Sequence, residues 1–335
     1  MNSTQHLNDS VGPSEGDWIY QIIAAEGAIG VLGNLLVCFV ILRVKFLHNM
    51  TNYLLVNLAV ADMLSCLIAF TFYFASFLKY NPASFGGRLL YCRLLISDFL
   101  PWAVIYASAY NLCLVTLERY VAIVHPLQYA RKLTAKRMTT LIALVWTMSF
   151  LISIPFIFDI EPAKESETAC SEITYPNHAF PILLSVLSFF MGYLLPITLM
   201  SWAYYKIQVN LKRQAKALNL QHARAAAYDL VIARQRLVSM LTIVLGALII
   251  LWTVCYIAIL LCLHPTDKGP FPFCGSESYR YIREISNIPF YLNSAINPII
   301  YEFKYKKFRQ GLRVTLCGCF KRHDSNRIEV EVLPL

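Results

Sequence analysis

Seven long apolar runs divide this chain of 335 residues, and they constrain its fold more than any other feature. A helix that spans a membrane needs about 20 mostly apolar residues. In lipid the backbone has no water to bond, so runs of this length become helices. Only 15% of the residues are charged, against about 25% in a soluble domain. The runs predict membrane-spanning helices at residues 19–42, 52–78, 89–124, 138–158, 180–207, 237–263 and 282–301.

The distribution of Lys and Arg predicts how the chain is oriented. If the N-terminus is outside, 21 of these residues fall on the cytoplasmic side and seven on the extracellular side, as the positive-inside rule requires. Residues 1–18 lack the basic and apolar regions of a signal peptide, so the first span acts as its own insertion signal. We therefore expect a multi-pass plasma-membrane protein whose N-terminus is outside.

The chain then reads as one all-α membrane protein, a seven-transmembrane helix bundle with a short amphipathic eighth helix. The expected parts are an extracellular tail (1–18), the bundle (19–301), an amphipathic cytoplasmic helix (302–316) and a cytoplasmic tail (317–335). The net charge of +9 reflects topology and attraction to anionic membrane lipid. No basic face with interleaved aromatic residues lies outside the spans, which argues against nucleic-acid binding.

The cysteines fall into groups by compartment. Cys92 begins the third span, and Cys170 is the only cysteine in the loop after the fourth span. Both face the oxidising side, so a Cys92–Cys170 bridge is expected. Cys262 and Cys274 flank the last outer loop, where a second bridge and free thiols both stay open. No His accompanies these sulfur atoms at ligand spacing, so a metal site is not predicted.

Modification sites are predicted at both ends of the chain. Asn2 and Asn8 open glycosylation motifs in the outer tail. Cys317 and Cys319 follow the amphipathic segment, where S-palmitoylation is expected.

Polar side chains interrupt four of the apolar runs: Asn34, Asp62, Ser108, Asn293, Ser294 and Asn297. Each of them alone could hydrogen-bond a neighbouring helix and do nothing more. Asp62 differs, because a lone buried carboxylate must be paired, metal-bound or protonated. If the helices converge, these residues could hold a hydrated cation, an outcome that the sequence alone leaves open.

Taken in order, the motifs resemble those of the rhodopsin-like G-protein-coupled receptors over residues 20–316. One motif falls in each span: "GNLLV", "NLAVAD", "LERYVAIVHPL", Trp146, Pro196, Trp252 and "NPIIY". Each motif alone is weak, but the ordered set is highly specific. The resemblance implies a receptor that binds an extracellular ligand and activates a heterotrimeric G protein when the sixth helix moves outward, with arrestin as a further partner and no enzyme activity.

The resemblance also implies roles for individual residues. An allosteric sodium pocket is expected at Asp62, Ser108, Asn293 and Asn297. G-protein coupling and switching are expected at Glu118, Arg119, Leu127, Tyr204, Trp252 and Tyr301. For either tyrosine alone, an aromatic anchor at the membrane interface is the competing reading.

Three positions and one spacing depart from the family pattern. Val254 replaces the usual proline two residues after Trp252, and Leu248 replaces the usual phenylalanine four residues before it. Arg234 occupies the position where many members carry an acid that faces Arg119, which predicts elevated signalling without ligand. The Cys92-to-Arg119 spacing is two residues longer than usual and includes Pro101, so we expect a bulge or kink there.

The ligand is expected to be a short peptide. Counting back from Arg119, the amine-binding aspartate of the family would fall at Pro101, and the nearest acid is Asp98. The second outer loop carries five acids against one base, which could attract a cationic ligand, although a plain solvated loop has the same composition. The expected ligand pocket comprises Asp98, Trp102, Tyr106, Trp252, Tyr256, Asn287 and Tyr291.

Two other readings compete with the peptide receptor. A receptor of the same fold for a lipid or a small non-amine molecule is the closer one. A transporter or channel is the distant one, because such folds often show internal repeats and none is visible here.

Glu118 and Arg119 lie side by side at the cytoplasmic edge of the third span. Adjacent residues on a helix do not face each other squarely. We therefore expect their attraction to be local and easily broken.

Overall fold

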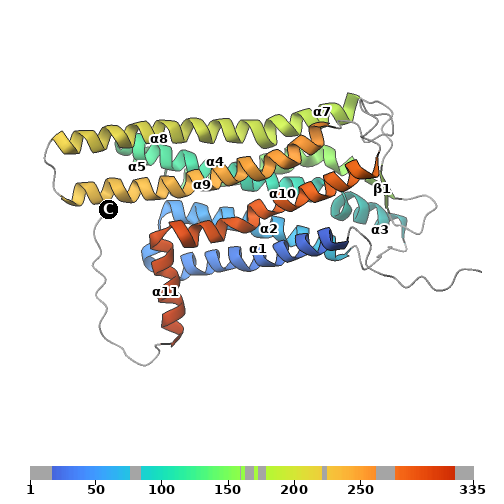
Figure 1. Ribbon diagram of the computed structural model, residues 1–335, viewed down its shortest axis with the longest axis horizontal. Helices are drawn as coiled ribbons and strands as arrows, with labels where there is room; N and C mark the ends of the chain where they lie inside the picture. Colours follow the sequence, from blue (N-terminus) through green and yellow to red (C-terminus); the bar gives the residue numbers. More distant parts are fainter. Residues whose placement is uncertain are drawn as a thin grey trace, which may run out of the picture.

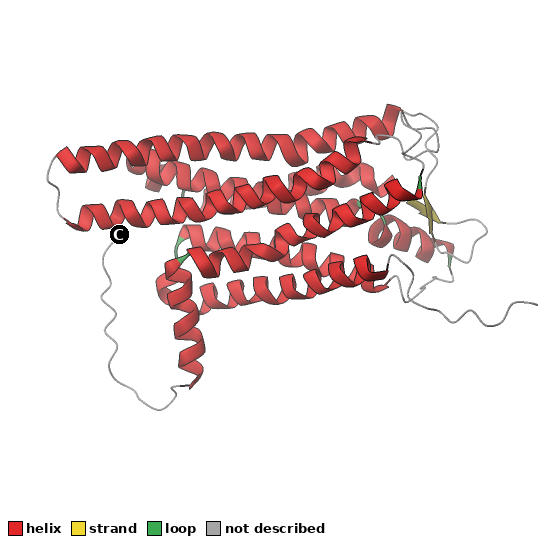
Figure 2. Cartoon of the chain, viewed as in Figure 1, coloured by secondary structure: helices red, strands yellow, loops and turns green. Residues whose placement is uncertain are grey.

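The computed structural model describes residues 17–75, 84–158, 160–162, 170–172, 179–220, 225–261 and 276–320. Long helices run nearly side by side along one axis, and a short helix turns away at one end (Figures 1 and 2). The helices in chain order are α1 (Asp17–Arg43), η1 (Lys45–Leu47), α2 (Met50–Ala75), α3 (Phe85–Leu90), η2 (Tyr91–Ile96), α4 (Phe99–Val124), α5 (Pro126–Lys132), α6 (Ala135–Ser153), η3 (Ile154–Phe158), α7 (Ala179–Ser188), η4 (Phe189–Leu194), α8 (Leu195–Leu220), α9 (Ala225–Leu261), α10 (Glu277–Lys304) and α11 (Lys306–Phe320).

Six helices of the described part are long and apolar enough to cross a membrane. They cover residues 18–43, 50–71, 85–124, 135–158, 182–218 and 231–261. The seventh rod is α10, whose outer half carries Arg283 and Glu284. It nevertheless packs along α1, α2 and α9 over its length. The predicted seven-helix bundle is therefore confirmed.

Polar side chains mark where several helices begin. Asn49 accepts a 3.0 Å hydrogen bond from the backbone N–H of Asn52, which caps α2. Thr134 and Ser276 cap α6 and α10 in the same way, through bonds of 3.4 and 3.2 Å. Pro126 begins α5, a position where its missing N–H costs nothing.

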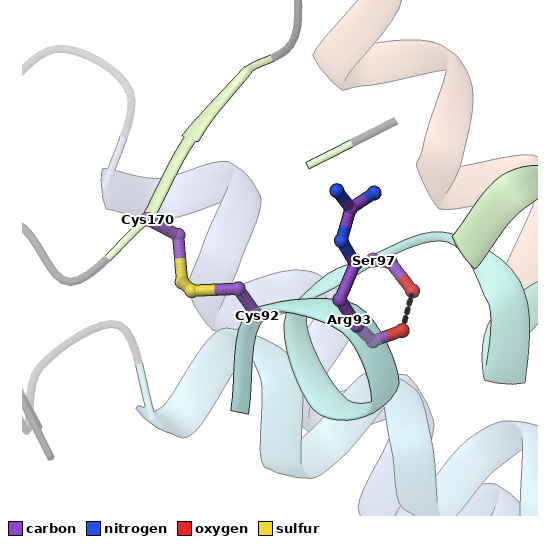
Figure 3. The surroundings of a disulfide bond; sticks show 4 residues. All are labelled: Cys92, Arg93, Ser97 and Cys170. Atoms are coloured by element: carbon purple, nitrogen blue, oxygen red, sulfur yellow. Dashed lines mark hydrogen bonds between the residues drawn. A yellow bond between two sulfur atoms is a disulfide. The ribbon is translucent and has the colours of Figure 1, made fainter. Parts of the chain in front are cut away.

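The third predicted span is interrupted rather than continuous. The π-helical turn η2 ends at Ser97, whose backbone is extended, and α4 starts again at Phe99. The Ser97 hydroxyl donates to the Arg93 carbonyl at 2.6 Å and closes this turn (Figure 3). The interruption accommodates the extra length between Cys92 and Arg119, so the expected bulge exists but precedes Pro101.

The second outer loop contains two strands that the sequence did not predict. β1 (Ile160–Pro162) pairs antiparallel with β2 (Cys170–Glu172), and Ile160 lies opposite Glu172. Cys170 is bonded to Cys92 as the sequence predicted, and this disulfide attaches the hairpin to η2 (Figure 3). The Arg93 guanidinium also donates to the Ile157 carbonyl at 2.9 Å, which holds the end of η3 beside η2.

The core follows α4, which packs against α2, α6 and α8. Large apolar side chains outside this core remain exposed along the outer faces of the rods, for example Leu32 on α1, Leu144 on α6 and Ile250 on α9. A soluble monomer rarely leaves contiguous apolar surface of this kind uncovered. These faces are suited to lipid.

Two features lie at the end of the bundle that carries α11. α8 and α9 extend past the other rods as an antiparallel pair (Figure 1). α11 was predicted at 302–316 and forms at Lys306–Phe320. A Cβ atom at Gly311 would lie 2.7 Å from Leu47, so α11 sits closely against η1.

Candidate functional site

A buried polar cluster lies in the middle of the bundle, around Asp62 of α2. Ser108 of α4 donates a 2.5 Å hydrogen bond to Oδ1 of Asp62, and Asn297 of α10 donates a 2.7 Å bond to Oδ2. All three side chains are buried. Two of the other three residues predicted for the sodium pocket therefore bond directly to the Asp62 carboxylate.

Several buried oxygen atoms near the same helices have no hydrogen-bond partner in the described part of the chain. They are Oδ1 of Asn293, Oδ1 of Asn297 and Oγ of Ser65. Buried polar atoms are normally satisfied by a protein group, a water or an ion. Carboxylate, amide and hydroxyl oxygens are also the ligands that hard cations prefer. The oxygen atoms of this cluster are therefore suitable ligands for a small cation.

A second cluster forms near the C-terminal end of α4, around the carboxylate of Glu118. Arg119 donates to both of its oxygens, with Nε at 2.5 Å from Oε2. Tyr129 of α5 donates to Oε1 at 2.6 Å, and Thr51 of α2 donates at 3.2 and 3.3 Å. Glu118 is fully buried, so three elements supply the partners that its charge requires.

This geometry corrects the expectation that the adjacent charges do not face each other. The arginine side chain is long enough to turn back along the helix, so its planar guanidinium meets the Glu118 carboxylate with two donors. Within this ion pair the Glu118 side chain is fully buried and the Arg119 side chain is 17% exposed. Arg234 of α9 is half-exposed and has no described acidic partner.

The Tyr129 hydroxyl is a stable donor in this cluster. Burial and the bond to Glu118 raise the pKa of Tyr129 to about 12, above the ordinary value for tyrosine. The hydroxyl therefore stays protonated at neutral pH and can only donate to the ionised carboxylate.

The two predicted switch tyrosines are separate from each other in this conformation. The Tyr204 hydroxyl shares a 2.7 Å hydrogen bond with Thr116 of α4. The Tyr301 hydroxyl is buried without a described partner, and its ring meets Phe308 of α11. Leu127 on α5 is 97% exposed, which leaves an apolar side chain at the surface just after the end of α4.

The predicted ligand-pocket aromatics form one packed cluster in the outer half of the bundle. Trp102 lies 5.5 Å from Tyr106 and 6.4 Å from Tyr256 between ring centroids. Trp252 is buried below them, 5.2 Å from Phe290. The sequence reading missed Phe290, although it is an aromatic residue on the same helix as Tyr291.

The other predicted pocket residues belong to α4 and α10, and among them the Tyr291 ring lies 5.8 Å from the Phe290 ring between centroids. Asp98 sits at the start of α4, and Asn287 and Tyr291 lie half-buried on α10. Most of the acidic second loop, the Cys262–Cys274 pair and the glycosylation motifs of Asn2 and Asn8 lie outside the described residues. Cys317 and Cys319 fall within the α11 backbone, and their side chains are outside the described part.

Sequence reasoning also missed a polar network between α2, α4 and α6. Asn57 donates to Asn111 at 2.6 Å and accepts from the indole of Trp146 at 3.1 Å. Both asparagines interrupt apolar runs, a signal that was available in the sequence. Thr51 and Tyr129 had no such signal, because polar residues at a membrane edge are ordinary.

A bundle of seven helices, with a buried carboxylate at mid-depth and a glutamate–arginine pair at the C-terminal end of α4, is the arrangement expected of a membrane receptor of the seven-transmembrane class. The comparisons with known proteins agree. The family profile described as "7 transmembrane receptor (rhodopsin family)" matches residues 33–301. The chain belongs to this family of G-protein-coupled receptors, and it is therefore a signalling receptor and not an enzyme.

Three receptors of the family are similar to this chain in sequence over most of its length. The chain is 31% identical to neuromedin-U receptor 2 of Rattus norvegicus, over 96% of this chain and 83% of the relative. It is 30% identical to rat somatostatin receptor type 4, over 92% and 75% of the two chains. It is 28% identical to rat trace amine-associated receptor 9, over 96% and 93%.

Proposed function

We propose that this receptor binds a short peptide at its extracellular end. The relatives named above include receptors for neuromedin U and somatostatin, but also a trace-amine receptor. The names alone therefore leave two ligand classes, and the residues of the outer pocket must decide between them.

The observation that carries the peptide proposal is the regular course of α4 from Phe99 to Val124. The count from Arg119 back to Pro101 crosses no bulge, because the interruption lies earlier, at Ser97. A buried proline therefore stands where an amine-binding aspartate would be expected. The nearest acid, Asp98, lies almost one turn further out, which suits a larger ligand that contacts the rim.

A reporter screen tests this proposal. Cells that express the receptor with a promiscuous G protein would be exposed to neuromedin U and somatostatin peptides, a wider neuropeptide library, trace amines and lipid extracts. We expect a saturable response to a peptide that is weakened at least tenfold by Trp102→Ala at equal surface expression. A response confined to amines or lipids would overturn the proposal, and the lipid outcome would support the small-molecule alternative.

For coupling, we propose that activation separates Arg119 from Glu118 while the cytoplasmic half of α9 moves outward. Leu127, which is exposed, would then insert into the G protein, and Tyr204 would leave Thr116 to approach Tyr301. Arrestin would use the same cytoplasmic opening. The separated tyrosines and the closed Glu118–Arg119 pair are what a resting receptor would need before such a change.

We also propose an allosteric sodium ion at Asp62. The ion would supply the positive charge that a buried carboxylate needs to stay ionised. Ser108 and the amide oxygens of Asn293 and Asn297 would complete its ligands. The unpartnered buried oxygens described above support this assignment.

At the membrane, we propose an outside N-terminus and contact between α11 and anionic lipid. Lys306, Lys307 and Arg313 are exposed on α11, whereas Phe308 is buried against the bundle. A basic amphipathic helix of this kind lies in the membrane interface. Glycosylation of Asn2 and Asn8 and acylation of Cys317 or Cys319 would fit the same orientation.

A further inference from the structure

α9 crosses the bundle without the proline that usually follows the tryptophan of this helix. It is continuous from Ala225 to Leu261, and Val254 directs its side chain outward with 48% exposure. Proline would remove a backbone hydrogen bond and kink the helix at this depth. If Trp252 acts in receptor switching as the family pattern implies, a feature other than proline must set the course of α9 beside it.

The adjacent residue, Thr253, provides such a feature. Its hydroxyl lies 2.5 Å from the Ile249 carbonyl of the preceding turn and 2.5 Å from the Tyr193 hydroxyl of η4. A threonine that bonds back to the carbonyl four residues earlier often bends a helix. The bond to Ile249 is of the kind that can bend α9, and the contact with Tyr193 ties α9 to the neighbouring rod.

The two hydrogen bonds of Thr253 form a hydroxyl relay from Tyr193 to Ile249, and the number of available protons decides its direction. Each hydroxyl has one proton to donate, and the Ile249 carbonyl can only accept. Thr253 must donate to Ile249, so Tyr193 must donate to Thr253. The hydrogen bonds therefore run in one direction, from the Tyr193 hydroxyl to the Thr253 hydroxyl and from there to the Ile249 carbonyl. Removing either hydroxyl breaks the link between η4 and α9.

The same tyrosine also belongs to the outer aromatic cluster. The Tyr193 ring lies 5.0 Å from Tyr256 and stacks at 5.5 Å on Phe189. Tyr256 is 6.4 Å from both Trp102 and Trp252. A ligand that displaces this cluster would therefore move Tyr193, and with it the bond to α9.

We propose that Tyr193 and Thr253 are positioning residues of the receptor switch, whose hydroxyl relay takes the place of the absent proline. The relay holds α9 against η4 when no ligand is bound, and displacement of the aromatic cluster releases it. This inference rests on the receptor activity that the family establishes, and it is independent of the identity of the ligand.

The test measures ligand-free nucleotide exchange on a purified G protein, with receptor variants reconstituted in lipid at matched folded amounts. Tyr193→Phe and Thr253→Val each remove one hydroxyl with little change of shape. A hydrogen bond contributes about 1 kcal/mol, so each variant should raise exchange about threefold to tenfold. The double variant should equal the stronger single variant, because both break the same link.

Two further variants separate the relay from general damage to the helix. Thr253→Ser keeps the hydroxyl and should stay near the wild-type rate. Thr242→Val removes a similar 2.9 Å bond from Thr242 to the Val238 carbonyl, on the same helix but with no described partner on α8. It should leave exchange unchanged. Equal effects of Thr242→Val and Thr253→Val, additive single effects, or wild-type exchange in both relay variants would each overturn the proposal.

A last variant tests the comparison with proline. In a Val254→Pro background the proline itself kinks α9, so the geometry of the helix no longer depends on Thr253. Adding Thr253→Val to this background should change ligand-free exchange less than twofold. If Thr253→Val has its full effect there, the relay does not replace the proline.

Discussion

Tyr129 of α5 donates a 2.6 Å hydrogen bond to the buried carboxylate of Glu118 on α4. This bond connects α5, in the loop after α4, to the residue that holds Arg119. Thr51 adds a donor from α2. The restraint on Arg119 is therefore built within the α2, α4 and α5 side of the bundle, and it needs no acid on α9.

Removing the tyrosine hydroxyl should weaken this restraint. Tyr129→Phe leaves Glu118 with fewer donors, and a hydrogen bond to a charged group contributes about 1.5–3 kcal/mol. Because the cluster is only partly buried at Tyr129, we expect ligand-free nucleotide exchange to rise about threefold. The increase should be the same at pH 6 and pH 8, since a tyrosine whose pKa is raised to about 12 stays protonated throughout this range.

Tyr120 provides the matched control for this variant. Its hydroxyl lies 3.4 Å from His125 at the same end of α4, a weak contact. Tyr120→Phe should leave exchange at the wild-type level. An equal increase in both variants would assign the effect to general loosening of the helix end.

Arg234 stands where an acid would add a restraint from α9, and its replacement is a second prediction. Arg234→Glu places a carboxylate at this half-exposed position, so it should attract Arg119 and lower ligand-free exchange about threefold, as expected for a partly screened pair. Arg236→Glu makes the same charge change at an exposed neighbour and should have no effect. Similar reductions by both would indicate a loss of attraction to G protein or lipid instead.

The sequence predicted the bundle well because its main signal is physical and local. Each span is long enough to cross a bilayer, and the family resemblance implied a shared pocket for Asp62, Ser108 and Asn297, although the sequence alone left open whether their helices converge. The sequence could not predict contacts between side chains that lie far apart along the chain. The bond from Thr51 to Glu118 joins residues 67 positions apart, and nothing near Thr51 in the sequence indicates it.

Local backbone irregularities were also beyond the sequence. The excess length before Arg119 predicted a bulge or kink, and the sequence analysis associated it with Pro101. In the structure the helix breaks earlier, at Ser97. The π-helical turn η4 precedes Pro196, whose missing N–H leaves a carbonyl of the preceding turn free. The Ser188 and Met191 carbonyls nearby accept bonds from Tyr256 and Tyr110.

The sodium proposal gives a third prediction. Replacing choline by sodium at constant ionic strength should lower ligand-free exchange in the wild type, because the ion stabilises the resting arrangement of α2, α4 and α10. Asp62→Asn removes the charge that binds the ion and should abolish this response. A sodium response of equal size in Asp62→Asn would show that the ion acts elsewhere.

Gly192 gives a fourth prediction, because it lies where η4 approaches the aromatic cluster most closely. A Cβ atom there would lie 2.5 Å from both the Tyr106 ring and the Tyr256 hydroxyl, closer than real contacts allow. Gly192→Ala must therefore displace one of the two tyrosines, and overpacking of this kind costs about 1–3 kcal/mol. We expect a thermal midpoint lower by several degrees and an agonist potency reduced at least tenfold.

A second glycine distinguishes this clash from the general effect of alanine in a helix. A Cβ atom added at Gly246 of α9 would meet no atom within 4 Å in the described part of the chain, apart from its own helix. Gly246→Ala should therefore leave potency unchanged and raise stability by up to about 1 kcal/mol, since alanine favours helix over glycine. If Gly192→Ala behaves like Gly246→Ala in both thermal melting and agonist titration, the tyrosines yield without cost, and the packing of Tyr106 and Tyr256 against η4 does not shape the ligand pocket.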